Sequence, residues 1–211
     1  REFKIPVFVD MGSGTPFDLA PYGIPGEWTV PSCLAQGADV VCFSGDKVLG
    51  GPQAGIILGR SELVERMARH PLHRAVRVDK FTIASLGATF RLIAQGRMER
   101  IPVLRMITEP DTDVKRRAQR LMRLVKTRGL RIVPTRAVIG GGAAPTKTFA
   151  SYGVAVRCDG ADRIHARLRA LRPAVLCRIE EDTLLFDLKA VDLQEVPLVA
   201  RAIDEVMGHG A

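Results

Sequence analysis

One lysine stands in a glycine-rich stretch that follows a predicted buried strand. The stretch is FSGDKVLGGPQAG, residues 43–55, and its lysine is Lys47. Open α/β sheets bind ligands at the carboxyl ends of their strands, so a lysine here can enter such a site. Removal from water lowers the pKa of a lysine, and its neutral amine can then condense with an aldehyde. The spacing makes Lys47 a candidate for covalent catalysis, with a solvated loop lysine as the alternative.

Two polar side chains accompany this lysine. Asp10 ends an apolar segment 37 residues before Lys47, and Ser44 stands three residues before it. A carboxylate near a Schiff-base lysine can keep a pyridinium nitrogen protonated, which preserves the cofactor as an electron sink. A hydroxyl at a strand end can bind a phosphate, and the neighbouring Gly45 lets backbone N–H groups approach a ligand. The alternative for Asp10 is a cap on the turn that follows it.

A pair of arginines suggests an anion site. Arg74 and Arg77 lie three residues apart in HPLHRAVR, residues 70–77, which is the spacing of one helix face. Two guanidinium groups so placed can hold a tetrahedral oxyanion through bidentate hydrogen bonds. A solvated basic turn is the alternative.

The surrounding pattern predicts an α/β chain in two parts. Short apolar strands are expected at 5–10, 38–43 and 54–58, with an irregular loop over 17–31. Helices are expected at 62–69, 79–94, 97–108 and 113–128, the second of them starting at its N-cap Asp79. The rest of the chain indicates an α+β layer. We expect strands at 130–139, 151–158, 174–179 and 183–188, with a hairpin turn at Glu181-Asp182, and helices at 161–171 and 192–207. We place the domain boundary between residues 90 and 91.

Composition and charge narrow the class of protein. The 211 residues are 46% hydrophobic, no apolar run approaches the roughly 20 residues of a membrane span, and the start lacks a signal-peptide pattern. Four cysteines without CxxC spacing are expected to be buried free thiols in a reducing cytoplasm, with a disulfide or a metal site as the alternative. The histidines lack the spacing of metal ligands.

A net charge of +8 favours polyanionic partners. The predicted helix 113–128 is the most basic segment, and its cations lie mostly away from its apolar stripe: Lys115, Arg116, Arg117, Arg120, Arg123, Lys126 and Arg128. Such a stripe can follow a phosphate backbone, and a solvated helix face is the alternative. The glycine-rich stretch 140–145 lacks a nucleotide-binding fingerprint.

The longest motif carries a family resemblance. The run FSGDKVLGGPQAGIILG, with DMGSG upstream and HPLHRAVRVDK downstream, resembles the bacterial L-seryl-tRNA(Sec) selenium transferases, or selenocysteine synthases. The likeness is strongest over residues 8–90 and stays collinear to the segment VLCRIEEDTLLFDLKAV. It implies an aspartate-aminotransferase-like (fold type I) pyridoxal-phosphate enzyme. Residues 1–90 would be a remnant of the large-domain sheet, and residues 91–211 the small α+β domain.

The resemblance also implies roles for the candidate residues. Lys47 would hold pyridoxal 5′-phosphate as a Schiff base, Asp10 would pair with the pyridine nitrogen and Ser44 would contact the phosphate. Asp46 would orient Lys47 or the substrate. Arg74 and Arg77 would bind selenophosphate or phosphate.

A further arginine, Arg178, would face the aminoacyl ester or the RNA, with an ordinary edge-strand arginine as the alternative. The implied reaction converts seryl-tRNA(Sec) to selenocysteyl-tRNA(Sec) through an aminoacrylyl intermediate. The glycine-rich stretch 140–145 would be a mobile loop near the active-site entrance.

The family's chains extend further at the N-terminus, so we expect a C-terminal fragment that is not competent alone. Family membership also implies a homo-oligomer in the cytoplasm. Two alternatives remain from the residues: a related pyridoxal-phosphate lyase acting on a small amino acid or amino-sugar phosphate, and a non-catalytic domain for assembly or RNA contact.

Overall fold

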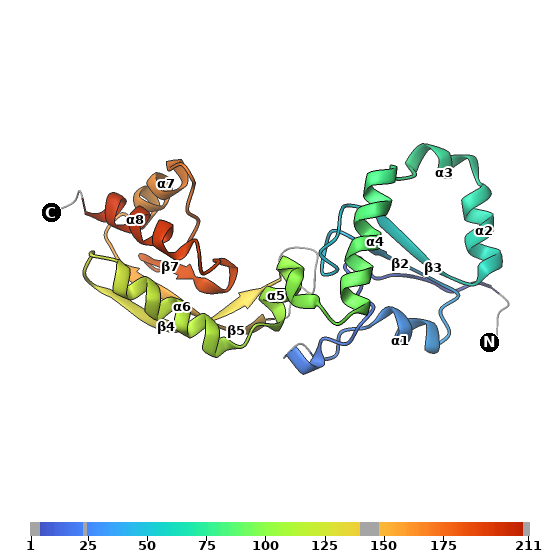
Figure 1. Cartoon of the computed structure of the whole chain (residues 1–211), viewed down its shortest axis with the longest axis horizontal. Coiled ribbons are helices and arrows are strands. Elements are labelled where there is room, and N and C mark those ends of the chain that lie inside the picture. The colour runs from blue at the N-terminus through green and yellow to red at the C-terminus, as the bar shows by residue number, and fades with distance from the viewer. Residues whose placement is uncertain (1–4, 23–24, 140–147, 209–211) are drawn as a thin grey trace. The chain divides into compact units, whose positions relative to one another are not determined.

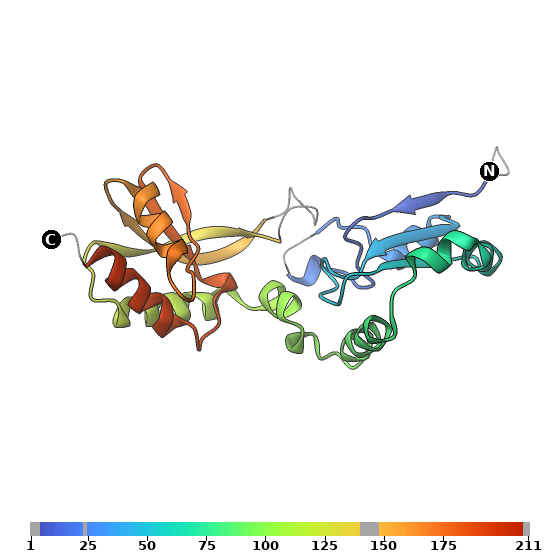
Figure 2. The same cartoon turned by 90° about the horizontal axis from the view of Figure 1, so that it is seen from above.

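The chain folds into two compact units, which we describe one at a time (Figures 1 and 2). The computed structural model describes residues 5–22, 25–139 and 148–208. Of these, residues 5–22, 25–108 and 138–139 form the first unit, and residues 109–137 and 148–208 form the second. The glycine-rich stretch 140–145 lies outside the described residues. Among the described helices, none combines the length and the apolar character that crossing a bilayer requires.

The first unit is built on a mixed sheet of three strands. Strands β1 (Phe8–Asp10) and β2 (Val40–Ser44) pair in parallel, and β3 (Gly55–Gly59) pairs with β2 in the antiparallel sense. The remaining elements of this unit are η1 (Ala20–Tyr22), α1 (Val30–Ala35), α2 (Ser61–Arg69), α3 (Pro71–Val76), α4 (Lys80–Ala94), η2 (Met98–Arg100) and α5 (Pro102–Thr108). Its core joins side chains from α1, β2 and α4.

Helix α1 starts inside the segment that we expected to be an irregular loop. The Thr29 side chain accepts a hydrogen bond from the Ser32 N–H (3.1 Å), and the Ser32 hydroxyl accepts one from the Thr29 N–H (2.9 Å). This reciprocal capping box satisfies two donors that a helix start leaves unpaired. Pro31 lies in the first turn, where the missing N–H costs nothing. Pro31 therefore lies in the first turn of a helix, although the segment 17–31 was expected to be an irregular loop.

The cap predicted for α4 is confirmed. One carboxylate oxygen of Asp79 accepts hydrogen bonds from the N–H groups of Phe81 (2.7 Å) and Thr82 (3.0 Å). The hydrogen bonds from Thr82 are the main reason that the pKa of the Asp79 carboxyl lies below its ordinary value.

The second unit is an antiparallel sheet covered by helices, as predicted. Its strands are β4 (Leu130–Val138), β5 (Thr148–Arg157), β6 (Arg178–Glu180) and β7 (Thr183–Asp187), in the spatial order β4-β5-β7-β6. Helices α6 (Asp111–Leu124), α7 (Ala161–Ala170) and α8 (Val196–Met207) and the short η3 (Leu188–Ala190) complete it. The β6–β7 turn has positive φ at Glu181 (46°) and Asp182 (58°), which identifies the predicted tight hairpin.

The division between the units lies later than the sequence suggested. The chain passes from one unit to the other between Thr108 and Glu109, whereas the predicted boundary at residues 90 and 91 falls inside α4. The reason is a close contact of Gly50, where an added Cβ would lie 2.5 Å from side-chain atoms of both Ile101 and Val103. The segment that includes η2 and α5 therefore packs on the first unit.

Arg117 is an exception to the basic face predicted for α6. Val114, Ala118 and Leu121 form the buried stripe of this helix, and Arg117 is buried beside them at 9% exposure. Its guanidinium forms an ion pair with the carboxylate of Glu109. The Glu109 carbonyl accepts a 2.7 Å hydrogen bond from Nζ of Lys189, whose pKa is lowered mainly by burial. Glu109 thus contacts two buried cations.

We expect Glu109→Gln to lower the free energy of unfolding by about 3 kcal/mol, because it leaves a buried guanidinium without its counter-charge. Asp113→Asn is the matched control, since Asp113 pairs with Arg116 on the exposed side of the same helix. Its cost should stay below about 0.5 kcal/mol. Urea denaturation of both variants measures the difference, and equal costs would contradict the burial of the Glu109–Arg117 pair.

Candidate functional site

The structure brings two of the predicted residues to one edge of the first sheet. In the parallel pair, Asp10 at the end of β1 lies opposite Cys42, and Ser44 ends β2. Backbone hydrogen bonds continue the pairing past the strand, from the Met11 N–H to the Cys42 carbonyl (2.9 Å) and from the Ser44 N–H to the Gly12 carbonyl (2.8 Å). Asp10 and Ser44 therefore share the carboxyl edge of β1 and β2.

The carboxylate of Asp10 is held through one of its two oxygens. Oδ1 accepts hydrogen bonds from the Gly12 N–H (3.0 Å) and from the Cys42 thiol (Sγ–Oδ1 3.4 Å). Oδ2 has no partner within the described part of the chain, and the residue is exposed. The pKa of the Cys42 thiol is raised to about 11. Burial is the largest cause, followed by the hydrogen bond to Asp10 and the negative charge of Asp10.

Sequence reasoning did not assign Cys42 to the site. All four cysteines were expected to be buried free thiols; the structure has all four free, but only Cys33 is fully buried. The contact with Asp10 depends on which residues of β1 and β2 lie opposite one another. A strand's own pattern sets its inward and outward faces but does not name its partner, so the sequence held no direct signal for this contact.

Backbone hydrogen bonds close the loop that carries Lys47. The Gly45 N–H donates to the Ala54 carbonyl (2.8 Å), the Gly51 N–H donates to the Gly45 carbonyl (2.8 Å) and the Gly50 N–H donates to the Lys47 carbonyl (3.0 Å). Gly50 has φ +72°, a conformation that favours glycine. The loop is thus a defined turn that returns the chain to β3.

The amine of Lys47 lies beside a carboxylate. Its Nζ is 3.2 Å from Oδ2 of Asp46, with the two side chains 40% and 29% exposed. Both residues line a pocket of about 350 Å³, together with Gly50, Gly51, Pro102, Val103 and Ile139. The amine is therefore reachable from solvent and has an anionic neighbour.

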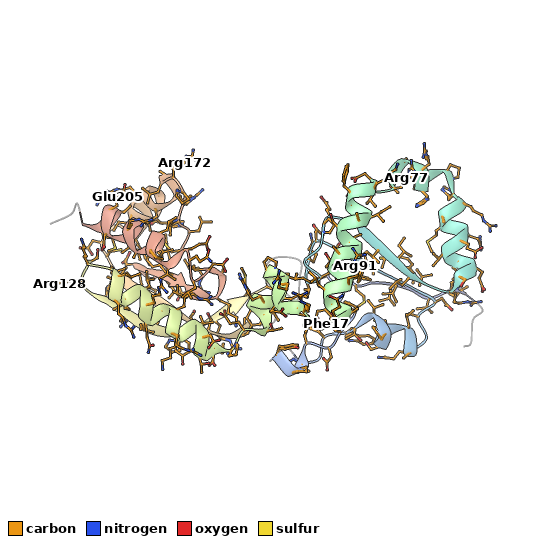
Figure 3. All side chains as sticks on the ribbon, in the orientation of Figure 1. Phe17, Arg77, Arg91, Arg128, Arg172 and Glu205 are labelled. Carbon is orange, nitrogen blue, oxygen red and sulfur yellow. The ribbon has the colours of Figure 1, made fainter. Side chains whose placement is uncertain are left out.

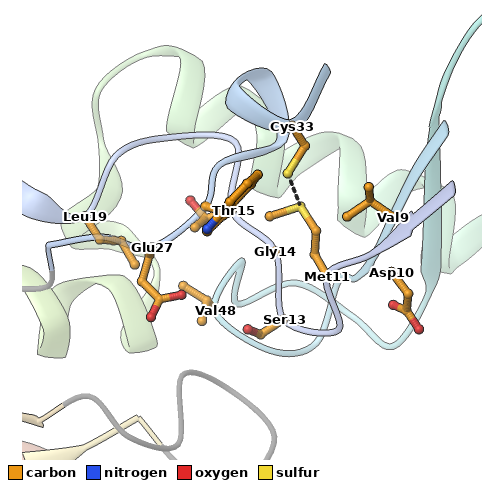
Figure 4. A pocket seen from close by; sticks show the side chains of 11 residues that line it. Val9, Asp10, Met11, Ser13, Gly14, Thr15, Leu19, Glu27, Cys33 and Val48 are labelled. Carbon is orange, nitrogen blue, oxygen red and sulfur yellow. Dashed lines mark hydrogen bonds between the residues drawn. The ribbon is translucent and has the colours of Figure 1, made fainter. Parts of the chain in front are cut away.

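A second pocket, of about 260 Å³, opens beside Asp10 (Figure 4). Asp10 and Glu27 supply carboxylates to its wall, and Cys33 and Met11 meet there with 3.8 Å between their sulfur atoms. Val48 lines this pocket, whereas the preceding Lys47 lines the other. In this structure Asp10 and Lys47 thus face neighbouring pockets.

The predicted arginine pair is only partly helical. Arg74 lies in α3, but the helix ends at Val76 and Arg77 is its C-cap, with extended backbone angles (φ −62°, ψ 140°). Both side chains are exposed, and Arg77 lies between α3 and α4 (Figure 3). The argument from one helix face therefore fails for Arg77, although both cations are accessible to an anion.

Arg178, the third candidate for a substrate anion, is engaged within the second unit. Its guanidinium donates to the Arg136 carbonyl (3.1 Å) and to the Thr135 hydroxyl. It also lies 3.6 Å from carboxylate oxygens of Glu180 and Asp187. These contacts join β6 to β4 and β7 and give Arg178 a structural role.

The side chains at the edge of the first sheet suit a pyridoxal cofactor chemically. The exposed Lys47 provides a primary amine, Asp10 keeps one carboxylate oxygen unpartnered among the described residues, and Ser44 adds a hydroxyl on the same edge. An added Cβ at Gly12, two residues after Asp10, would meet no atom within 4 Å, so the turn after β1 has open space at Gly12. Among the described residues, no group of three or more His, Cys, Asp or Glu side chains is placed to hold a metal ion.

Comparison with known proteins gives a consistent result along the chain. A family model described as SelA, L-seryl-tRNA selenium transferase, matches residues 1–192. The L-seryl-tRNA(Sec) selenium transferase of Carboxydothermus hydrogenoformans is 43% identical over 97% of this chain, and that of Aquifex aeolicus is 38% identical over 98%. These matches cover 46% and 47% of the two relatives, so the chain spans about half their length.

Among solved structures, an α-aminoadipate aminotransferase from Thermus thermophilus complexed with N-(5′-phosphopyridoxyl)-L-leucine matches 97% of this chain and 51% of its own. The TM-score is 0.38 and the identity 13%. A transaminase with L-alanine matches 99% of this chain and 47% of its own, with a TM-score of 0.33 and 12% identity. Similarity at this level adds nothing to the α/β class seen directly in the strands and helices.

Gly50→Ala should destabilise the first unit by about 2 kcal/mol or more. The new Cβ would collide with Ile101 and Val103 and force a left-handed backbone on alanine. Gly96→Ala is the control, because Gly96 also has positive φ (+69°) but has open space around it. The control should cost only about 1 kcal/mol. Denaturant unfolding of the two variants tests the contact, and equal costs would argue against it.

Proposed function

This chain belongs to the L-seryl-tRNA selenium transferase family, and we propose that it supplies the cofactor-binding lysine of an enzyme converting seryl-tRNA(Sec) to selenocysteyl-tRNA(Sec). The observation that carries the proposal is the 43% identity over 97% of the chain with a relative of that name, a match that includes the Lys47 loop. Because the chain spans about half of such relatives, we assign the reaction to a longer enzyme of which this chain is a part. The relatives' names favour this activity over a related lyase.

The residues divide the work of the proposed site. Pyridoxal 5′-phosphate, when bound, supplies an electron sink that lets an amino acid lose its α-proton. Lys47 would hold the cofactor through its amine, and the same amine, when free, would take and return that proton. Asp46, whose Oδ2 lies 3.2 Å from Nζ, would orient the amine. Oδ2 of Asp10 would accept a hydrogen bond from the ring N–H, and the Ser44 hydroxyl would contact the phosphate.

The second substrate is proposed to be selenophosphate, held by arginines. Arg74 and Arg77 are exposed, and guanidinium groups bind phosphate-like oxyanions in a bidentate manner. Arg178 is the weaker candidate, because it would have to leave Glu180 and Asp187 to reach a substrate. We therefore assign the anion to Arg74 and Arg77.

The proposed RNA partner is supported by the outer face of α6. Six cations on α6 and the residues that follow it are exposed, whereas Arg117 is buried: Lys115, Arg116, Arg120, Arg123, Lys126 and Arg128. Nζ of Lys115 also lies 5.2 Å from the ring centre of Tyr152 on β5, so an aromatic side chain adjoins this face. Exposed cations next to an aromatic ring suit a phosphate backbone with unstacked bases.

Assembly with further protein is supported by apolar surface on the first unit. Three large apolar side chains of α3 and α4 are strongly exposed, namely Leu72 (60%), Val76 (68%) and Phe81 (86%). Apolar surface concentrated in this way marks a protein interface. We propose that the enzyme is a homo-oligomer and works in the cytoplasm, where aminoacyl-tRNA is available.

Adding pyridoxal 5′-phosphate to the purified chain should produce an absorbance band that depends on Lys47. Borohydride should fix the cofactor to Lys47, and Lys47→Ala should lose both the band and the cross-link. Lys80→Ala is the control, because Lys80 is an exposed lysine of α4 outside the site. A wild-type chain without a Lys47-dependent band would favour the non-catalytic alternative for this chain.

Replacing Arg116, Arg120 and Arg123 together by Gln should weaken binding of seryl-tRNA(Sec). The slope of log K against log salt should become shallower by about 2, because each lost phosphate contact removes about 0.7–0.9. The control replaces three exposed arginines of α7 by Gln, namely Arg163, Arg167 and Arg169, and so lowers the net charge by the same amount as the α6 variant. Filter binding at several salt concentrations measures both slopes, and equal changes would mean that overall charge, not the α6 face, governs binding.

A further inference from the structure

The carboxylate of Asp10 is held by donors from two separate segments of the first unit. The Gly12 N–H reaches Oδ1 from the turn after β1 (3.0 Å), and the Cys42 thiol reaches the same oxygen from β2 (3.4 Å). The strand register fixes this arrangement, since Asp10 and Cys42 are paired residues of a parallel ladder. Two donors on one oxygen restrict rotation of the carboxylate about its side-chain bonds.

Oδ2, the other carboxylate oxygen of Asp10, is the one that can accept a hydrogen bond from a ligand. Oδ2 has no partner within the described residues, and Asp10 is exposed. A carboxylate that accepts a hydrogen bond from a ring N–H binds the ring more tightly when its orientation is already fixed. The entropy of ordering the carboxylate is then lost on folding and does not weaken ligand binding. The contacts on Oδ1 provide that fixation.

A thiol is a suitable donor for this task. It donates weakly and, because its pKa is raised to about 11, it stays neutral at physiological pH. A lysine or arginine in its place would neutralise Asp10 and compete with the ring nitrogen for its charge. Cys42 therefore orients the carboxylate and leaves its negative charge available.

We propose that Cys42 is a positioning residue: together with the Gly12 N–H it fixes the Asp10 carboxylate so that Oδ2 remains available to the ring nitrogen of a pyridoxal cofactor. That the ligand is a pyridoxal cofactor rests on the proposed function, whereas the contact between Asp10 and Cys42 is a property of this chain alone. The two are therefore tested separately.

The first experiment tests the contact without any cofactor. Alkylation of each cysteine by iodoacetamide is followed by mass spectrometry at several pH values, in the wild-type chain and in Asp10→Asn. The negative charge of Asp10 and its hydrogen bond both favour the thiol over the thiolate, so removing the charge lowers the pKa of Cys42. Its alkylation rate at pH 8 should rise by about threefold or more.

Cys158 is the internal control for this experiment. Its pKa is raised by burial and by Asp159 and Asp182, so Asp10→Asn should leave its alkylation rate unchanged. An unchanged Cys42 rate in Asp10→Asn would overturn the proposal. An equal rise at Cys33, which is buried in the core of the first unit, would also overturn it, because the variant would then be acting through general loosening of that unit.

The second experiment asks whether Cys42 acts through Asp10. The probe is 4′-deoxypyridoxine 5′-phosphate, which has the ring nitrogen and phosphate but no aldehyde, so its binding does not require a bond to Lys47. Affinities are measured by calorimetry for wild type, Cys42→Val, Cys42→Ser, Asp10→Asn and the double variant Asp10→Asn/Cys42→Val. Valine keeps the bulk without a donor, and serine keeps a donor.

Cys42→Val should weaken binding about three- to tenfold, as expected for one lost hydrogen bond, and Cys42→Ser should retain most of the affinity. In the Asp10→Asn background the valine substitution should have almost no effect. An equal loss in both backgrounds, or no loss in either, would overturn the positioning role. If the wild-type chain does not bind the probe, the proposed cofactor site fails, and the alkylation result still decides the contact.

Discussion

The parallel pairing of β1 with β2 is the constraint on which the candidate site depends. It places Asp10 opposite Cys42 and brings Ser44 to the same sheet edge. A slip of one residue would turn Asp10 to the other face of the sheet and remove the carboxylate from the site. The edge is secured beyond the strands as well, because the backbone of Met11 and Gly12 stays hydrogen-bonded to the end of β2. The loop that carries Lys47 starts directly after β2, so the same strand register also fixes where this loop leaves the sheet.

The second unit relies on a different interaction, the pairing of buried charges at its first residue. Glu109 contacts Arg117 through its carboxylate and Lys189 through its carbonyl. This arrangement turns one arginine of a strongly basic helix inward and leaves the others on the surface. The distinction has a functional meaning, since a charge already neutralised inside the protein cannot bind a phosphate. A count of cations along α6 therefore overstates the positive charge that this helix presents to solvent.

The sequence predicted the elements better than the contacts between them. Strands β1 to β3, the Asp79 cap and the Glu181-Asp182 turn were accessible because each depends on neighbouring residues. The long lysine motif also identified the family without any geometry. What the sequence missed depends on partners distant along the chain or on a residue with two possible roles. Pro31 can end or begin a helix, and the Cys42 thiol meets Asp10 only because two strands pair in one register.

The contact of Gly50 with Ile101 and Val103 has a consequence for how related proteins diverge. Two segments about fifty residues apart in the sequence share one small space, so neither can change its volume independently. A lineage that acquires a side chain at position 50 should carry smaller residues at 101 and 103. A lineage that enlarges those positions should keep glycine at 50. Substitutions at position 50 and at positions 101 and 103 would then be correlated among related proteins, because the packing between the Lys47 loop and α5 couples them.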